Sequence, residues 1–231
     1  MPHLDRSATV AQIVTEHALA GRIFQKYGID YCCHGNVTLP QACQGLRVKP
    51  EELFAEVEAA LAAAPPASDE DARSASTPAL LARIVDRHHG YLRRALPAIA
   101  PIAAKVAKVH GPHDPRLREV EAAFGALAAA LLPHLDEEEE VLFPALMSRS
   151  PDATLVVGEL EKMLTDHLAV GDLLALLRAL TDGFATPEWG CNTYRVLMAE
   201  LGGLEADILA HVHLENHVLM PRFAGLCPRA A

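Results

Sequence analysis

Two stretches of this sequence repeat one pattern in register, and they limit the possible folds more than any other feature does. Residues 134–144 read HLDEEEEVLFP and residues 211–221 read HVHLENHVLMP, with His, Glu, Val, Leu and Pro at matching positions. A separation of four residues puts the His and the Glu of each stretch on one face of a helix, about one turn apart. Each stretch is therefore predicted to be a helix that offers two ligands to one metal ion.

The composition favours helices in the rest of the chain. Aromatic residues make up only 5% of the 231 residues and hydrophobic residues make up 51%, which is typical of a globular helical protein. Glycine and proline divide the second part of the chain into four long helical segments with short connections, and this predicts an antiparallel up-down bundle. The expected fold class is all-α, with the following bundle segments: 78–109, 115–149, 152–182 and 188–223.

A stretch rich in Pro, Ser, Ala and acidic residues separates the bundle from the N-terminal part. It reads APPASDEDARSASTP and has no apolar periodicity, which is typical of a linker. We expect a small helical domain over residues 1–63, a linker over 64–78 and the four-helix bundle over 79–231. The small domain contains two predicted helices and, between them, the turn-rich segment YGIDYCCHGNVTLPQAC.

The other two bundle helices are expected to supply one histidine each. His167 is the only histidine of the third segment, and its spacing from apolar neighbours places it on the buried face. The first segment offers both His88 and His89, and their apolar neighbours do not choose between them. The separation from His89 to His134 is 45 residues. That from His167 to His211 is 44 residues, and this pseudo-two-fold spacing favours His89.

These residues together predict a metal centre. Glutamate is almost never buried unless it is paired or bound to a cation, and Glu138 and Glu215 both have the inward phase. Four imidazoles with two carboxylates suit first-row transition ions better than Ca²⁺ or Mg²⁺, and six donors are too many for one tetrahedral zinc. We predict two ions, each held by two histidines and bridged by both carboxylates. The predicted ligands are His89, His134, Glu138, His167, His211 and Glu215.

Further expectations concern residues beside this centre. The remaining acidic residues of the run are expected on a solvated face: Asp136, Glu137, Glu139 and Glu140. Pro133 is expected to kink its helix or to open a wide turn. Asp207 lies one turn before His211 and is expected to accept the second ring N–H of that histidine. His217 is expected to be exposed.

The cysteines point to reduced thiols. They form an odd set without the spacing of a disulfide framework or a four-cysteine zinc site: Cys32, Cys33, Cys43, Cys191 and Cys227. Adjacent Cys32 and Cys33 could bind a metal ion, exchange disulfides with a partner or simply be buried. The spacing leaves these three roles open.

The charge of the chain argues against two classes of partner. A formal net charge of −10 repels the phosphates of nucleic acids and anionic lipid, so we expect neither nucleic acid nor membrane as a partner. The N-terminus lacks a basic segment followed by an apolar stretch, and a cytoplasmic location is expected. No nucleophilic triad, phosphate loop or dinucleotide fingerprint competes with a metal centre.

The repeated stretches, together with His89 and His167, resemble the hemerythrin-like four-helix di-iron fold. The segment YGIDYCCHGNVTLPQAC resembles the signature of the small N-terminal domain in the iron-sulfur cluster repair di-iron proteins, the RIC family. This resemblance extends over essentially the whole chain. It implies two iron ions in an oxo- and carboxylate-bridged centre on the same six ligands. It also implies a thiol role for Cys32 and Cys33, although His34 stands where the family usually has glycine.

The resemblance implies repair of iron-sulfur clusters damaged by nitrosative or oxidative stress, through donation of iron rather than enzymatic turnover. The implied partners are damaged iron-sulfur proteins, with nitric oxide or oxygen as small ligands. Cys32 and Cys33 also make a homodimer through the small domain an expectation. Two alternatives stay open: a nitric oxide-binding sensor or scavenger linked to denitrification control, and an oxidoreductase that turns nitric oxide into nitrous oxide. Oxygen-carrying hemerythrins use five histidines asymmetrically, so the symmetric set of four argues against oxygen storage.

Overall fold

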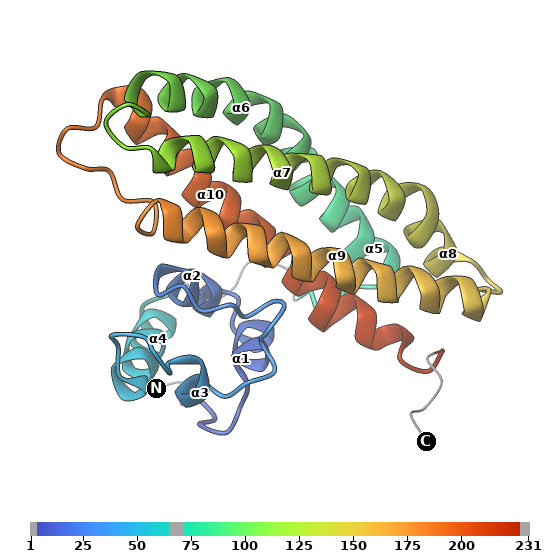
Figure 1. The fold of residues 1–231 in the computed structure, drawn as a ribbon. Helices are drawn as coiled ribbons and strands as arrows, with labels where there is room; N and C mark the ends of the chain where they lie inside the picture. The colour runs from blue at the N-terminus through green and yellow to red at the C-terminus, as the bar shows by residue number, and fades with distance from the viewer. Residues whose placement is uncertain (1–3, 65–71, 227–231) are drawn as a thin grey trace. The chain divides into compact units, whose positions relative to one another are not determined.

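The structure is a computed structural model, drawn in Figure 1, which describes residues 4–64 and 72–226. Across these residues the regular structure is helical, and the β-type pairing is limited to a single bridge between Thr9 and Thr38. The predicted all-α fold class is confirmed. None of the helices in the described part of the chain is both long enough and apolar enough to cross a membrane.

The chain folds as two compact units. One contains Met1–Leu80 together with Leu209–Gly225, and the other contains Leu81–Ile208. The last part of the bundle sequence therefore belongs to the same unit as the N-terminal segment. Two sequence expectations fall outside the described residues, namely the part of the linker at 65–71 and the thiol of Cys227.

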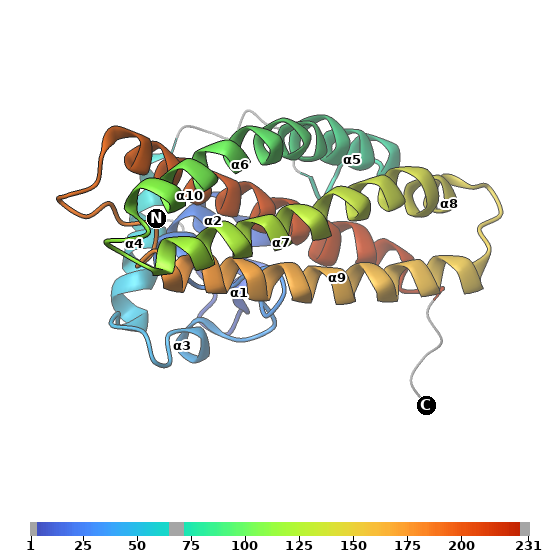
Figure 2. The same ribbon diagram turned by 45° about the horizontal axis from the view of Figure 1, so that its top comes forward.

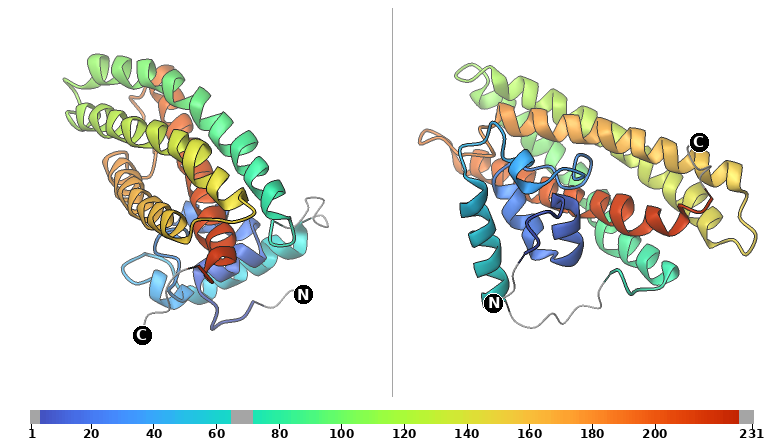
Figure 3. Two further views of the ribbon diagram at one scale, coloured as in Figure 1. Left: turned by 90° about the vertical axis from the view of Figure 1, so that its right-hand side faces the viewer. Right: turned by 90° about the horizontal axis from the view of Figure 1, so that it is seen from below.

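The first unit begins with short helices, coloured blue and cyan in Figure 3, which enclose a small apolar core. Thr9 and Thr38 each begin a helix, and their backbone N–H groups donate to the side chains of Gln12 and Gln41 at 2.8 Å and 2.9 Å. These contacts satisfy backbone donors that a helix start leaves open. The helices are α1 (Val10–Glu16), α2 (Leu19–Lys26), α3 (Leu39–Ala42) and α4 (Pro50–Ala63). The core contains Val10, Ile13, Phe24, Leu39, Leu53 and Val57.

The second unit contains the helices of an antiparallel bundle. Figures 1 and 2 show α6, α7, α9 and the first part of α10 running alternately in opposite directions, as the short connections predict. Leucines buried to 1% exposure or less fill the interior between these helices. The elements from the linker onward are α5 (Thr77–Arg83), η1 (Ile84–His89), α6 (Gly90–His110), α7 (Arg116–Glu137), η2 (Glu138–Leu142), α8 (Phe143–Met147), α9 (Ala153–Leu180), α10 (Asn192–Leu214), η3 (Glu215–Leu219) and η4 (Met220–Phe223).

Wide helical turns interrupt the long helices at the predicted ligands. The elements η1, η2 and η3 are π-helical turns, in which the backbone closes hydrogen bonds over one more residue than in an α-helix. Two of them begin at equivalent positions of the repeat, η2 at Glu138 and η3 at Glu215. Such single turns occur frequently at functional sites.

The wide turn expected at Pro133 lies further along the chain. Helix α7 continues through Pro133 to Glu137, and the wide turn follows it. Buried Leu131 and Leu135, on either side of the proline, hold the helix against the core, so the loss of one backbone hydrogen bond does not end it.

Gly35 provides a test of the packing in the first unit. A Cβ at this position would lie 2.3 Å from the carbonyl oxygen of Tyr31 and 2.7 Å from the Cβ of Ala11. Gly35→Ala is therefore expected to lower the free energy of unfolding by about 1–3 kcal/mol through overpacking. Gly125→Ala in α7 is the matched control. No atom lies within 4 Å of its added Cβ, so this variant is expected to gain up to about 1 kcal/mol.

Urea unfolding followed by circular dichroism measures both changes. Equal unfolding free energies for the two variants would contradict the packing described for Gly35.

Candidate metal centre

Three of the predicted ligands converge in the interior of the bundle. His134 lies in the last turn of α7, four residues before Glu138, and His167 lies in α9. The Nε2 atom of His134 lies 3.1 Å from Nε2 of His167 and 3.3 Å from Oε1 of Glu138. The ligand atoms of the three residues all lie within 4.8 Å of one another, and each residue is buried. One ion could therefore bind all three.

His89, at the end of η1, faces the other oxygen of the same carboxylate. Its Nε2 atom lies 3.4 Å from Oε2 of Glu138, whereas His134 faces Oε1. Two imidazoles thus face the two oxygens of one buried carboxylate. A carboxylate that bridges two ions needs this arrangement.

His88 lies elsewhere, since its Nδ1–H donates to Oδ1 of Asp207 over 3.0 Å. The expectation that Asp207 accepts from His211 is therefore wrong about the partner. The Oδ1 atom of Asp207 is instead the hydrogen-bond acceptor of the buried His88 ring.

Glu139 orients the ring of His89. Its Oε1 atom accepts hydrogen bonds from Nδ1 of His89 at 2.8 Å and from Arg93 at 3.0 Å. Burial raises the pKa of Glu139, but these two hydrogen bonds outweigh burial and hold the pKa below its ordinary value. With Nδ1 as the donor, the lone pair of Nε2 is left facing Glu138, as a metal-binding histidine requires.

Glu139 is half-exposed, as Glu137 is, with 31% and 32% of their side chains accessible, but its carboxylate also contacts His89, which the expectation of a purely solvated residue did not include. The other acidic residues of the run are exposed or half-exposed: Asp136, Glu137 and Glu140.

The second copy of the repeat belongs to the first unit and builds the same local pair. Nε2 of His211 lies 2.9 Å from Oε1 of Glu215, and both residues have 0% exposure. His211 lies in the last turn of α10, and Glu215 opens η3. The His–Glu pair therefore sits at a transition from α to π geometry in both copies, as His134 and Glu138 do.

The chemistry of the donors fits a metal ion. A buried carboxylate requires positive charge close by, because its transfer from water costs several kcal/mol otherwise. Imidazole nitrogens of His89 and His134 face the two oxygens of Glu138, and Nε2 atoms are good ligands for first-row transition ions. A cavity of about 10 Å³ adjoins His134 and Glu138, which is room for about one water-sized molecule.

The two predicted thiols lie side by side in the first unit. Cys32 is buried and Cys33 is half-buried, and their Sγ atoms are 3.5 Å apart. The hydrogen bond with Cys33, burial and the nearby Asp30 carboxylate all raise the pKa of Cys32 well above its ordinary value. His217, expected to be exposed, is half-buried, because its Nε2–H donates to the carbonyl of Cys32 over 2.8 Å.

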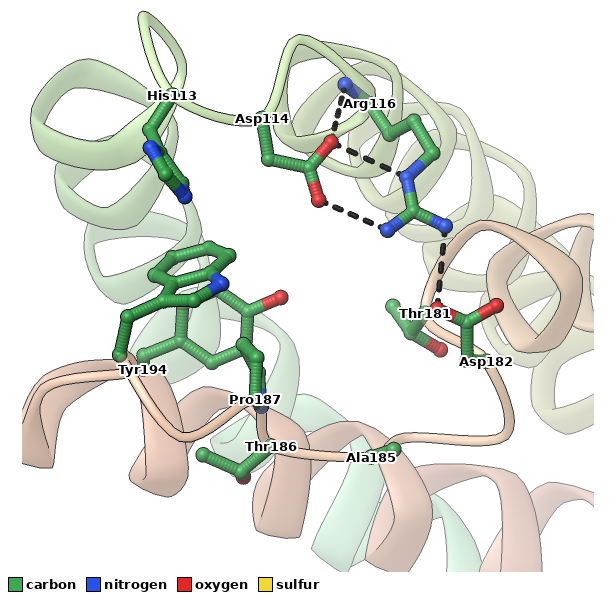
Figure 4. A pocket seen from close by; sticks show the side chains of 10 residues that line it. His113, Asp114, Arg116, Thr181, Asp182, Ala185, Thr186, Pro187 and Tyr194 are labelled. Carbon is green, nitrogen blue, oxygen red and sulfur yellow. Dashed lines mark hydrogen bonds and ion pairs between the residues drawn. The ribbon is translucent and has the colours of Figure 1, made fainter.

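A larger pocket lies apart from the predicted ligands. It has a volume of about 340 Å³ in the second unit, and Figure 4 shows Arg116 beside it, bonded to both Asp114 and Asp182. Close to its Trp189 and Tyr194, the exposed thiol of Cys191 lies 3.2 Å from Nε2 of His110. That contact lowers the pKa of Cys191 to about 7. None of the predicted metal ligands lines this pocket.

Comparison with known families accounts for both parts of the chain. Residues 80–223 match the hemerythrin HHE cation binding domain, and residues 6–61 match the ScdA_N domain, described as a domain of unknown function (DUF542). The chain belongs to the hemerythrin HHE cation-binding family. The resemblance inferred from the repeated His–Glu stretches is thereby confirmed.

Relatives of this hemerythrin-family chain extend over nearly its whole length. It is 34% identical to the iron-sulfur cluster repair protein ScdA of Staphylococcus haemolyticus, over 96% of this chain and 100% of that protein. It is 32% identical to the iron-sulfur cluster repair proteins YtfE of Yersinia pseudotuberculosis and Yersinia pestis, over 88% of this chain and 90% of theirs. The chain is therefore also a member of the family that contains these repair proteins.

The orienting role of Glu139 can be tested by removing its carboxylate. Glu139→Ala leaves His89 without this acceptor, so the affinity for ferrous iron is expected to fall by about 10–100-fold. Glu140→Ala, which removes the neighbouring exposed carboxylate, is the matched control and should keep the affinity of the unchanged protein. Competition with a coloured iron chelator under anaerobic conditions measures both. Indistinguishable affinities of the two variants would show that Glu139 does not orient a ligand.

Proposed function

We propose that this chain is a cytoplasmic di-iron protein that takes part in the repair of damaged iron-sulfur clusters by donating iron. The observation that carries the proposal is the buried carboxylate of Glu138, which has an imidazole facing each of its two oxygens. The names of the relatives support the repair role, and the donor set supports iron as the cargo. Stress by nitric oxide or oxidants is the condition under which this repair would be needed.

The proposed centre uses both copies of the repeat. In this proposal one ion takes His134 and His167, the other takes His89 and His211, and both glutamates are shared. Two features support this grouping: the equivalent α-to-π transitions at the two His–Glu pairs, and the continuity of α10, which carries His211 as one helix from Asn192. When bound, the two ions would supply ferrous iron and coordination positions open to small ligands. The proposed ligands are His89, His134, Glu138, His167, His211 and Glu215.

The residues of the centre are suited to giving iron up. Four neutral imidazoles and two carboxylates carry a total charge of −2. A site with four glutamates and two histidines carries −4, so it offsets more of the positive charge of bound iron. Oxygen donors favour hard cations, so a set dominated by nitrogen holds ferric iron less firmly. Glu139 keeps the ring of His89 aligned by accepting from Nδ1–H, the tautomer that leaves Nε2 without a proton. The protein can therefore keep its ligands in place as iron leaves.

The thiols are proposed to act at the recipient. Cys32 and Cys33 would dock to the damaged iron-sulfur protein, reduce it or transiently bind the transferred iron. Cys33 is the more accessible of the two, so the first contact would be made there. A homodimer through the small domain would bring two such thiol pairs together.

A nitric oxide-binding sensor or scavenger is the second candidate function. The observation that favours it is the cavity of about 10 Å³ beside His134 and Glu138, which is room for about one small molecule next to the proposed ligands. Tight, reversible formation of an iron nitrosyl without any repair activity would support this alternative.

The repair proposal is tested with an enzyme whose iron-sulfur cluster has been damaged by nitric oxide. Glu138→Gln and Glu215→Gln keep the shape of each side chain but remove its charge, so both variants are expected to lose iron and most of the repair rate. Glu140→Gln is the matched control and should repair as the unchanged protein does. Recovery of the damaged enzyme's activity under anaerobic conditions is the measurement. Normal repair by either inward-facing variant would falsify the iron-donor role.

A further inference from the structure

The loop between α2 and α3 holds a second group of metal-binding side chains, separate from the His/Glu centre. A carboxylate oxygen of Asp30 and the Sγ atoms of Cys32 and Cys33 all lie within 4.8 Å of one another. We propose that Asp30, Cys32 and Cys33 form a site for a single thiophilic divalent cation of the zinc or ferrous-iron type. This proposal rests on and deepens the thiol role proposed above, but its test measures metal binding alone, so its failure and a failure of iron donation by the His/Glu centre are distinguishable.

The identity of the donors selects the class of ion. Two thiolates with one carboxylate suit Zn²⁺ and Fe²⁺, whereas Ca²⁺ and Mg²⁺ require oxygen ligands throughout. Ions bound to thiolate sulfur at about 2.3 Å place two sulfur atoms less than 5 Å apart, and the Sγ atoms of Cys32 and Cys33 are 3.5 Å apart. Both sulfurs can therefore bind one ion with small side-chain rotations.

A fourth donor lies beside these three. His34 follows Cys33 directly, and its Nδ1 atom lies 2.7 Å from Oδ2 of Asp30. Its ring is bonded to Asp30 and lies outside the group of three, but the side chain is 67% exposed, so there is room for the ring to exchange that bond for an ion. With His34 the donor set becomes two sulfurs, one nitrogen and one oxygen, which completes a tetrahedral site.

Hydrogen bonds fix the loop before any ion binds. Oδ1 of Asp30 accepts the backbone N–H groups of Cys32 and Cys33, each at 2.9 Å. The carbonyl of Cys32 accepts from Nδ2 of Asn216 at 3.1 Å and from Nε2 of His217 at 2.8 Å, both within the same unit. Because these contacts already order the loop, ion binding loses little further conformational entropy, and only a few side chains need to move.

The burial of the donors agrees with a binding site. Cys32 has 2% exposure, so its sulfur is shielded from solvent, whereas Cys33 is half-buried and leaves a route of entry. Gly35 packs against the backbone of Tyr31 and the Cβ of Ala11, where a side chain would not fit.

Cobalt(II) is the probe that separates this site from the His/Glu centre. Thiolate ligands give Co²⁺ an intense sulfur-to-metal charge-transfer absorption, which imidazole and carboxylate ligands cannot produce. The full-length chain, reduced and free of oxygen, is titrated with Co²⁺. The His/Glu centre also takes up Co²⁺, so we expect the intensity of the band, rather than the total cobalt bound, to correspond to one thiolate-bound ion per chain. The band should disappear when Zn²⁺ displaces the cobalt.

Variants test whether the charge-transfer band arises from the thiols of the loop between α2 and α3. Cys33→Ser alters a half-buried side chain and should keep the fold, yet it is expected to weaken the binding that gives the band by at least about tenfold. Asp30→Asn should weaken it as well. Cys191→Ser removes the exposed thiol beside His110, and Glu138→Gln alters the His/Glu centre. Both of these controls should keep the band.

Three results would overturn the proposal. They are the absence of a charge-transfer band in the reduced full-length chain, a band that survives Cys33→Ser, and a band that is lost in Cys191→Ser. A disulfide between Cys32 and Cys33 would also abolish the band, so thiols are counted before each titration and only chains with reduced thiols are used.

Discussion

The buried carboxylate of Glu138 is the constraint on which the rest of the bundle depends. A charge in this position needs a cation, and the side chains facing its two oxygens are imidazoles rather than lysine or arginine. Ordinary packing of leucine around the same helices would be more stable without it. The Glu138 carboxylate therefore lowers the stability of the bundle, and metal binding by the surrounding donors gives a reason for its presence.

The helical backbone is adapted to this constraint. Both repeat glutamates open a π-helical turn, and His89 closes another, so the ligands lie where the regular helical period is broken. A wider turn changes the direction in which successive side chains point. The turn η2 begins at Glu138, and the next residue, Glu139, accepts from the outer nitrogen of His89. This single turn thus contains both a proposed ligand and the acceptor that orients another.

The sequence was most informative where regular periodicity decides the outcome. The bundle helices and the inward phase of His134 and Glu138 follow from spacing alone, because helix geometry fixes which residues share a face. The partners of Glu139, Asp207 and His217 could not be predicted in this way. Each depends on contacts with residues far away in the sequence, and His217 bonds to the carbonyl of Cys32 across 185 positions. Asp30 went unnoticed because its role depends on the turn that folds it back onto Cys32 and Cys33.

The central claim is a centre that binds two iron ions, and metal analysis tests it most directly. The protein is purified without exposure to air, its metals are counted, and its optical spectrum is recorded before and after oxidation. The account predicts two iron ions per chain and an oxo-bridge absorption that appears on oxidation. A chain that carries a single zinc ion in the bundle, with no such absorption, would contradict it.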